Sequence, residues 1–251
     1  MQREQRRIGK RNMRRLDLPP PFRLVVLREV GDAFAHACDH ASELGAGALV
    51  FVGRFDLAEF AVVLEPDEPL VSARRAFYAC MVALGDALAV SAPPEKPVVI
   101  GWPDAVFVDR GLIGGGRLAW PDHADECVVP DWLVFGAAIR TVSLNAEESG
   151  LHPLSTALEA EGFDDVSSER LVEGFARHLM VAVDRWQEDG FAPIAREYIS
   201  KLKPEGGARH NIGDNGDFGI WHTGKQTECR KLLPALRAPS WLDPRTGGRH
   251  L

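Results

Sequence analysis

The stretch Ile100–Leu118, IGWPDAVFVDRGLIGGGRL, combines short apolar runs, two turn signals and three consecutive glycines. Val98–Ile100 and Val106–Val108 are rich in β-branched residues, which favours strands. A Trp-Pro-Asp turn separates these two runs, and an Asp-Arg-Gly turn at 109–111 leads into the glycines. The stretch therefore predicts a β-hairpin that continues into a third, glycine-containing strand.

The three glycines are Gly114, Gly115 and Gly116. Glycine adopts backbone angles that are closed to other residues, and it lets a ligand lie against the main chain. Packing alone rarely requires three glycines in one strand, because each of them weakens the strand. We therefore expect these glycines to line a ligand site.

The order of strand, Trp-Pro turn, strand, turn and glycine strand resembles the biotin and lipoate protein ligases. That family carries KWPND, then an apolar strand, then a catalytic lysine just before a glycine. Trp102 and Pro103 match without gaps, and Gly115 falls on the glycine of the family. The two lysines of the family fall on Gly101 and Leu112. The resemblance implies that the scaffold is kept and that the ligase chemistry is removed.

Lysine is scarce through most of the chain: Lys96 is the only one between residues 11 and 200. Ligases of this family form an acyl-adenylate, and a buried ammonium near the α-phosphate stabilises the developing charge. Arg110 and Arg117 lie close enough in sequence to substitute for it. Arg140 ends a strand that resembles the GIGIN strand of the family, at the position of its asparagine. The resemblance implies these three arginines as catalytic candidates.

The Gly/Arg-rich loop that covers the adenylate in the ligases corresponds here to Gly53–Phe60. Gly53 and Arg54 remain from it, but two acids replace basic residues and would repel a phosphate. Asp104 stands where the family has asparagine, and it either binds a polar group of the ligand or caps the Trp-Pro turn. The implied ligand-binding residues are Gly53, Arg54, Trp102, Asp104, Gly114, Gly115 and Gly116.

The pattern of strands and helices is α+β, and the resemblance covers roughly residues 23–198. We expect a biotin/lipoate ligase-like mixed sheet, with helices packed on one side of it, and a small β-rich C-terminal domain. The expected boundaries are a basic, disordered tail at 1–18, the ligase-like domain at 19–200 and the small domain at 201–251. Outside the hairpin, the predicted strands are Phe22–Leu27, Ala48–Val52, Phe60–Leu64, Trp132–Ser143 and Phe218–His222, and the predicted helices are Asp32–Leu44, Ser72–Val90 and Ser167–Trp186.

The last segment, Ala238–Pro244, contains Trp241. A tryptophan would have no packing role in a flexible, exposed tail. We therefore expect this segment to be ordered and to clamp against the rest of the protein.

Composition excludes several classes of protein. The 251 residues carry a net charge of −7, which disfavours a general nucleic-acid binder. No apolar run approaches the ~18–20 residues that cross a bilayer. The four cysteines lack CxxC spacing, which indicates reduced thiols in a cytoplasmic protein. Two groups contain residues of the types that bind metal ions: His36 with His40, and His123 with Asp125, Glu126 and Cys127. Neither group provides a convincing set of ligands, so we expect no metal site.

Three functions remain open from the sequence. The first is a divergent ligase-like protein that binds a small carboxylic acid or its acyl-adenylate without orthodox ligase activity. The second is an active ligase or transferase that acts on a carrier protein, with arginine in place of the catalytic lysine. It would use ATP and Mg²⁺ with biotin, lipoate or octanoate. The third is a structural subunit of a larger complex. The sequence leaves undecided whether the protein is an enzyme.

Overall fold

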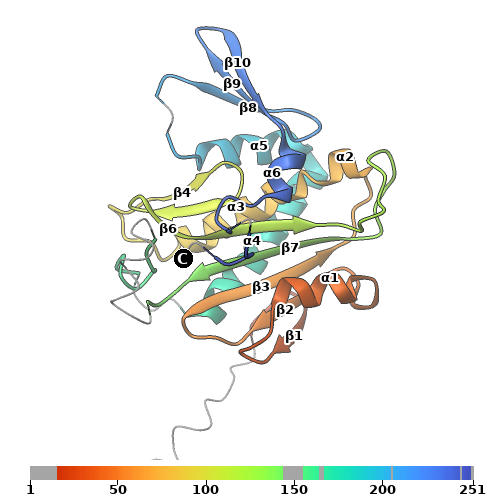
Figure 1. Ribbon diagram of the computed structural model, residues 1–251, viewed down its shortest axis with the longest axis vertical. Helices are drawn as coiled ribbons and strands as arrows, with labels where there is room; N and C mark the ends of the chain where they lie inside the picture. The colour runs from red at the N-terminus through yellow and green to blue at the C-terminus, as the bar shows by residue number, and fades with distance from the viewer. Residues whose placement is uncertain (1–15, 144–154, 164–166, 205, 244, 250–251) are drawn as a thin grey trace, which may run out of the picture.

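The computed structural model describes residues 16–143, 155–163, 167–204, 206–243 and 245–249 (Figure 1). In chain order the elements are β1 (Arg23–Leu27), α1 (Ala33–Leu44), β2 (Ala48–Val52), β3 (Leu57–Leu64), α2 (Leu70–Ala73), α3 (Ala76–Ala89), β4 (Val98–Gly101), β5 (Ala105–Val108), β6 (Gly111–Ala119), β7 (Leu133–Arg140), α4 (Ser168–Asp189), α5 (Phe191–Ser200), β8 (Arg209–Ile212), β9 (Phe218–His222), β10 (Lys225–Arg230) and α6 (Leu232–Arg237).

The main sheet has seven strands in the order β1-β2-β3-β7-β6-β5-β4. Only β1 and β2 pair in parallel, with α1 as their connection, and the remaining neighbours are antiparallel. A second, three-stranded antiparallel sheet of order β10-β9-β8 follows in the C-terminal part. The α+β architecture with a mixed sheet and a small C-terminal β unit is therefore confirmed.

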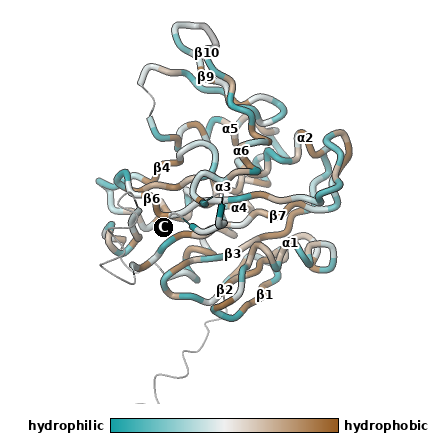
Figure 2. The backbone as a smooth tube through the Cα atoms, in the orientation of Figure 1, coloured by the Kyte–Doolittle hydropathy of each residue, from teal (hydrophilic) through white to brown (hydrophobic). Residues whose placement is uncertain are grey.

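Helices cover both faces of the main sheet, so the expectation of helices on one side is wrong. Val50, Ala61 and Val134 pack with α1 on one face, here called the α1 face. The residues next to them along the strands, such as Phe51 and Phe135, pack with α3 and α4 on the opposite face. Strands buried on both faces are apolar throughout rather than alternating, which explains the sequence ALVFV of β2. Figure 2 shows such hydrophobic stretches along β2 and β3.

The predicted starts of two helices are confirmed by their capping residues, although α4 continues to Asp189, beyond the expected end at Trp186. Asp32 precedes α1 and accepts a hydrogen bond from the Ala35 N–H at 2.9 Å, and Gly45 ends the helix at φ 69°. Ser167 caps α4 in the same way, through the Arg170 N–H at 3.2 Å. A short polar side chain that satisfies a free N–H group is a signal that sequence alone reveals.

Other boundaries differ from the expected ones. The single helix expected over 72–90 is divided into α2 and α3, because Arg75, Phe77 and Tyr78 donate backbone hydrogen bonds to the residues three positions earlier. Strand β3 begins at Leu57 rather than Phe60. Helix α5 and strands β8 and β10 had no counterpart among the expected elements.

The small sheet is attached to the main body by aromatic and polar contacts around α3. Trp102 stacks on Phe218 of β9 with ring centroids 5.5 Å apart. The Tyr78 hydroxyl donates to the Gly216 carbonyl at 2.7 Å and accepts from the Trp102 indole N–H at 3.1 Å. Leu232 of α6 is buried in the main core. The C-terminal part of the chain is therefore packed directly against the larger sheet.

Of the tail expected at 1–18, the structure describes residues 16–18. Residues 1–15 of the expected basic tail lie outside the described residues. Within the described part, Leu16 is buried in the main core and Leu18 packs against it. The Asp17 carboxylate pairs with Arg177 of α4 at 2.9 Å.

Candidate functional site

The central strands place four small residues side by side on the α1 face. Gly101 pairs with Ala105, Ala105 with Gly115, and Gly115 with Ala138, across β4, β5, β6 and β7. We call these four residues the small-residue row. Neighbouring strands lie about 4.8 Å apart, so the row forms a floor about 14 Å wide. Glu59 of β3 pairs with Ala138 and borders the row on its other side.

Each glycine of β6 meets a different steric demand. A Cβ on Gly115 would lie 2.3 Å from the Asp104 carbonyl oxygen and 2.4 Å from Trp241 Cδ1. A Cβ on Gly114, which has φ +146°, would lie 1.9 Å from the Ala138 carbonyl oxygen. Gly116 faces the opposite side of the sheet, where a Cβ would meet Met81 at 2.6 Å. Close packing within the chain thus requires glycine at these three consecutive positions.

The chain's own C-terminal segment covers the row. We call Pro239–Arg249 the C-terminal strap; residue 244 within it is not described. Trp241 is 1% exposed and packs with Leu57, Ala105 and Ala138. Its indole N–H donates to the Gly116 carbonyl at 3.0 Å. Figure 1 shows this last segment crossing in front of β6 and β7, on the side of the sheet that carries α1. The ordered clamp expected around Trp241 is confirmed.

Asp104 directly precedes Ala105 of the row and is a buried acid. One carboxylate oxygen accepts from the Ser240 backbone N–H at 2.8 Å, and the other accepts from the Ser240 hydroxyl at 2.6 Å. Burial raises the pKa of Asp104 to about 6, although both hydrogen bonds from Ser240 act in the opposite direction. In this structure Asp104 therefore holds the strap through its side chain, while its carbonyl accepts from the Gly116 N–H at 2.9 Å.

Glu59 is the second buried acid at the row. It is 3% exposed, and its carboxylate accepts from the Ala33 N–H at the start of α1 and from Arg249 of the strap, at 3.2 and 2.6 Å. A buried carboxylate needs such partners, because leaving the charge unpaired inside the protein is costly. The strap thus supplies the cation that pairs with Glu59.

Arg117 and Arg140 lie on the α1 face, on opposite sides of the row. Arg117 is two residues beyond Gly115 on β6, and Arg140 is two residues beyond Ala138 on β7, so each lies about 7 Å from the row along its strand. The Arg117 guanidinium stacks over Phe34 at 4.0 Å and pairs with Asp32 at 3.1 Å. Burial lowers the pKa of Arg117, against the influence of Asp32.

The remaining predicted residues are dispersed. Arg54 forms an ion pair with Asp56 at 2.8 Å, and it follows Gly53 in the loop before β3, near the Arg140 end of β7. Arg110 lies in the exposed turn between β5 and β6, at φ 70°. Trp102 braces the small sheet through Phe218 rather than facing the row. The structure therefore brings together Asp104, Gly115 and Arg117, with Arg140 at the far side of the row.

Several residues at the site were not expected there: Ser240, Arg249, Glu59 and Lys203. The strap residues contact the row across more than a hundred positions of sequence, and no local pattern reveals such a pairing. The Lys203 ammonium lies 5.5 Å from the centroid of the Phe107 ring. That ring fills the space beside Gly101, where a Cβ would lie 2.8 Å from it.

The two groups with metal-ligand types do not form a cluster. The rings of His36 and His40 stack 4.4 Å apart, and Glu126 pairs with Arg74 at 3.2 Å. Among the described residues, no three His, Cys, Asp or Glu side chains gather in a way that could hold a metal ion. Within the same residues, no helix is long and apolar enough to cross a membrane.

Comparisons with known proteins agree with this geometry. The model of the biotin/lipoate A/B protein ligase family matches residues 18–200. A search of curated proteins found no match. A biotin protein ligase-like protein of unknown function from Silicibacter sp. TM1040 is 29% identical with a TM-score of 0.73, covering 86% of this chain and 96% of that one.

A biotin protein ligase from Aquifex aeolicus, solved in complex with biotin and ATP, is 14% identical with a TM-score of 0.61. That similarity covers 83% of this chain and 98% of the other, and it concerns the fold alone. The apo structure from the same organism has a TM-score of 0.64 at 14% identity, covering 84% of this chain and 99% of that one. Because the family model spans more than half of the sequence, the chain belongs to the biotin/lipoate A/B protein ligase family.

Proposed function

We propose that this protein binds a small carboxylic acid or its acyl-adenylate over the small-residue row, without orthodox ligase activity. The observation that carries the proposal is the row itself, a floor of Gly101, Ala105, Gly115 and Ala138 with an arginine beyond it on either side. Small side chains leave room for a flat or extended ligand, and guanidinium groups bind carboxylate and phosphate.

The positions of three of the four described lysine side chains argue against orthodox ligase chemistry. Lys96 pairs with Glu161 at 2.7 Å, Lys201 is bonded to Asp86, and Lys231 pairs with Asp217 at 2.7 Å. None of these three ammonium groups belongs to the α1 face of the row. These three ammonium groups are therefore not positioned to stabilise the charge that develops in the adenylate-forming step, which leaves Lys203, near Phe107, as the remaining described lysine side chain.

The charges around the row suggest an orientation for the ligand. Asp104 and Glu59 are acids, so they repel a carboxylate and accept hydrogen bonds from N–H or O–H groups. Arg117 is the cation next to Gly115 along β6. We therefore place the acid or phosphate group of the ligand toward Arg117 and its uncharged polar end toward Asp104.

The proposal is tested by thermal shift and calorimetry with biotin, lipoate and octanoate, each alone, with Mg-ATP, and as the preformed acyl-adenylate. A ligand at ~100 times its Kd stabilises the fold by about 2.7 kcal/mol. We expect stabilisation by an adenylate and no AMP release from acid plus ATP. Arg117→Met should weaken binding, whereas Arg110→Met, in the exposed turn, should leave it unchanged. If no compound binds, the proposal fails and a structural subunit becomes the better reading.

One observation favours the second candidate function, an active ligase or acyltransferase acting on a carrier protein. Lys203 enters from the segment after α5 and reaches Phe107, beside the position where the family has its first lysine. Release of AMP from Mg-ATP and one of the acids, abolished by Lys203→Ala or by Arg117→Met, would establish it.

The four cysteines are all free thiols, which supports a cytoplasmic location for either function.

A further inference from the structure

The floor proposed to receive a ligand is covered by the chain itself. The indole of Trp241 lies on Gly115 so closely that a single Cβ there would collide with it at 2.4 Å. Its other contacts are to Ala105 and Ala138 of the same row. A ligand that lies on the row and the indole of Trp241 cannot be present there together.

Three separate anchors hold the strap in this position. Ser240 donates two hydrogen bonds to Asp104, Trp241 donates one to the Gly116 carbonyl, and Arg249 pairs with Glu59 at 2.6 Å. Each partner on the sheet, the two acids and the carbonyl, is an acceptor next to the row. The strap therefore occupies both the apolar floor and the polar groups around it.

Described residues on the two sides of residue 244 are also bonded to one another within the strap. The Asp243 N–H donates to the Gly248 carbonyl at 2.7 Å, and the Gly247 N–H donates to the Asp243 carbonyl at 2.8 Å. Leu242 forms a β-bridge with Arg249. These bonds connect the part of the strap next to Trp241 with Arg249, which pairs with Glu59. The anchors at Ser240 and Arg249 therefore hold one connected unit.

We propose that the C-terminal strap is an intramolecular inhibitor of the row, and that a ligand binds only when Trp241 leaves it. This inference rests on the proposed function, because it concerns the same floor. The apparent Kd of a ligand equals its intrinsic Kd divided by the fraction of molecules in the open state. Any change that releases the strap without altering the floor therefore tightens binding.

The experiment compares the full-length protein with two variants that each remove one anchor, Trp241→Ala and Arg249→Ala. The probes are biotinyl-5′-AMP and octanoyl-AMP, titrated by calorimetry after circular dichroism has confirmed that each variant is folded. We expect both variants to bind one of the two adenylates at least tenfold more tightly than the wild type. Trp221→Ala is the matched control, because Trp221 bonds Asn211 in the small sheet and should leave affinity unchanged.

Hydrogen exchange supplies a second readout on the unmodified chain. The Ser240 amide is protected while it donates to Asp104, so a saturating adenylate should make this amide exchange faster. Ligands that bind without displacing a segment slow exchange around their site instead. Faster exchange at Ser240 thus identifies displacement of the strap.

The outcomes separate this inference from the proposed function. If the wild type binds an adenylate as tightly as both variants do, and Ser240 is not deprotected, the strap does not inhibit and the proposed function stands. Weaker binding by Trp241→Ala would make Trp241 a wall of the site and would also overturn the inference. If neither wild type nor variants bind either adenylate, the proposed function and the inference fail together.

Discussion

Gly115 lies in close contact with both the sheet and the strap, so its substitution tests this packing directly. A Cβ there meets the Asp104 carbonyl at 2.3 Å, and that oxygen is fixed because it accepts from the Gly116 N–H. We expect Gly115→Ala to lower the free energy of unfolding by about 1–3 kcal/mol, since overpacking forces backbone and side chains to shift. Urea unfolding followed by circular dichroism measures this loss.

Gly206→Ala is the matched control for that substitution. A Cβ on Gly206 meets nothing within 4 Å. Its effect on the free energy of unfolding should stay within about 0.5 kcal/mol, as for most surface changes. An equal, small effect at both positions would show that the close contacts of Gly115 with Asp104 and Trp241 do not form in solution.

Asp104 gives the stability of the protein a pH dependence with a defined sign. Burial raises its pKa to about 6, above the value of about 3.9 for an unfolded aspartate, so the folded state holds the proton more strongly. The stability contributed by protonated Asp104 is complete below pH ~4 and is lost as the pH rises through 6. Relative to Asp104→Asn, the wild type should lose up to about 3 kcal/mol between pH 4 and pH 7.

Asp217 provides a control of opposite sign. Burial raises its pKa, but hydrogen bonds from Lys231, Leu232 and Asn215 outweigh this and lower it overall. Its contribution is therefore present above the unfolded pKa and is lost as the pH falls. Urea titrations against the wild type should therefore give differences of opposite sign: Asp104→Asn changes between pH ~4 and pH ~7, and Asp217→Asn changes between pH ~5 and pH ~2.5. A pH-independent difference for Asp104→Asn would contradict the burial of that carboxyl.

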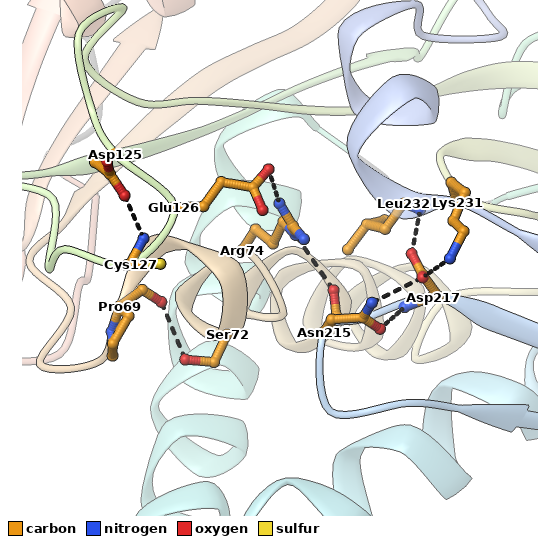
Figure 3. Close-up of polar contacts among 10 residues, drawn as sticks. All are labelled: Pro69, Ser72, Arg74, Asp125, Glu126, Cys127, Asn215, Asp217, Lys231 and Leu232. Atoms are coloured by element: carbon orange, nitrogen blue, oxygen red, sulfur yellow. Dashed lines mark hydrogen bonds and ion pairs between the residues drawn. The ribbon is translucent and has the colours of Figure 1, made fainter.

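At the scale of elements, the residue that follows α2, Arg74, contacts two distant loops through one side chain. Arg74 is 4% exposed; it donates to the Asn215 carbonyl at 3.2 Å and pairs with Glu126 at 3.2 Å (Figure 3). Arg74→Met should keep most of the packing but leave the Asn215 carbonyl without this donor, at a cost of about 1–3 kcal/mol in unfolding free energy. Hydrogen exchange should also rise in the 214–217 turn.

Ser72→Ala, two residues earlier and within α2, is the control for Arg74→Met. The Ser72 hydroxyl donates to the carbonyl of Pro69, the residue before α2, at 3.0 Å, and among the described residues this bond joins it to neither loop. Its loss should leave exchange in the 214–217 turn unchanged. Equal exchange in that turn for Arg74→Met and the wild type would mean that the turn is held by Asp217 and its partners alone.

The elements that sequence predicted are those defined by local signals. The hairpin around Trp102 and the helix starts at Asp32 and Ser167 each depend on residues within a few positions, and all three are confirmed. Helix α5 was missed because its Gly190 and Pro193 resemble loop residues. Pro193 is tolerated in a first turn, where its missing N–H has no helical acceptor.

The site was predictable only in part, for the same physical reason. The sequence predicted a glycine-containing strand with open space over it. In the structure that space is filled by Trp241, which lies 126 positions beyond Gly115. A local sequence pattern indicates whether the side chains on a surface are apolar or small. It does not indicate which distant segment packs against them. Glu59 shows the same limit: it was interpreted as a repelling acid in a loop, yet it lies in β3 and is paired with Arg249.

At the scale of the molecule, the C-terminal unit is more closely integrated than a separate domain. Phe218 stacks on Trp102, Leu232 and Leu236 of α6 belong to the main core, and the strap then returns across the large sheet as far as Glu59. The chain after residue 200 thus contacts the larger part of the protein at three places. A unit with so many contacts to its neighbour is not expected to unfold by itself.

We therefore expect one cooperative unfolding transition, with coincident midpoints by far-UV circular dichroism and tryptophan fluorescence. Phe218→Ala removes the ring that stacks on Trp102 and should cost about 3–5 kcal/mol while the two probes still coincide. Trp221→Ala, three residues along the same strand and half-buried, should cost much less. Two resolved transitions in the wild type would contradict this expectation, because they would require a small sheet that remains folded after its contacts with Trp102 and Tyr78 are lost.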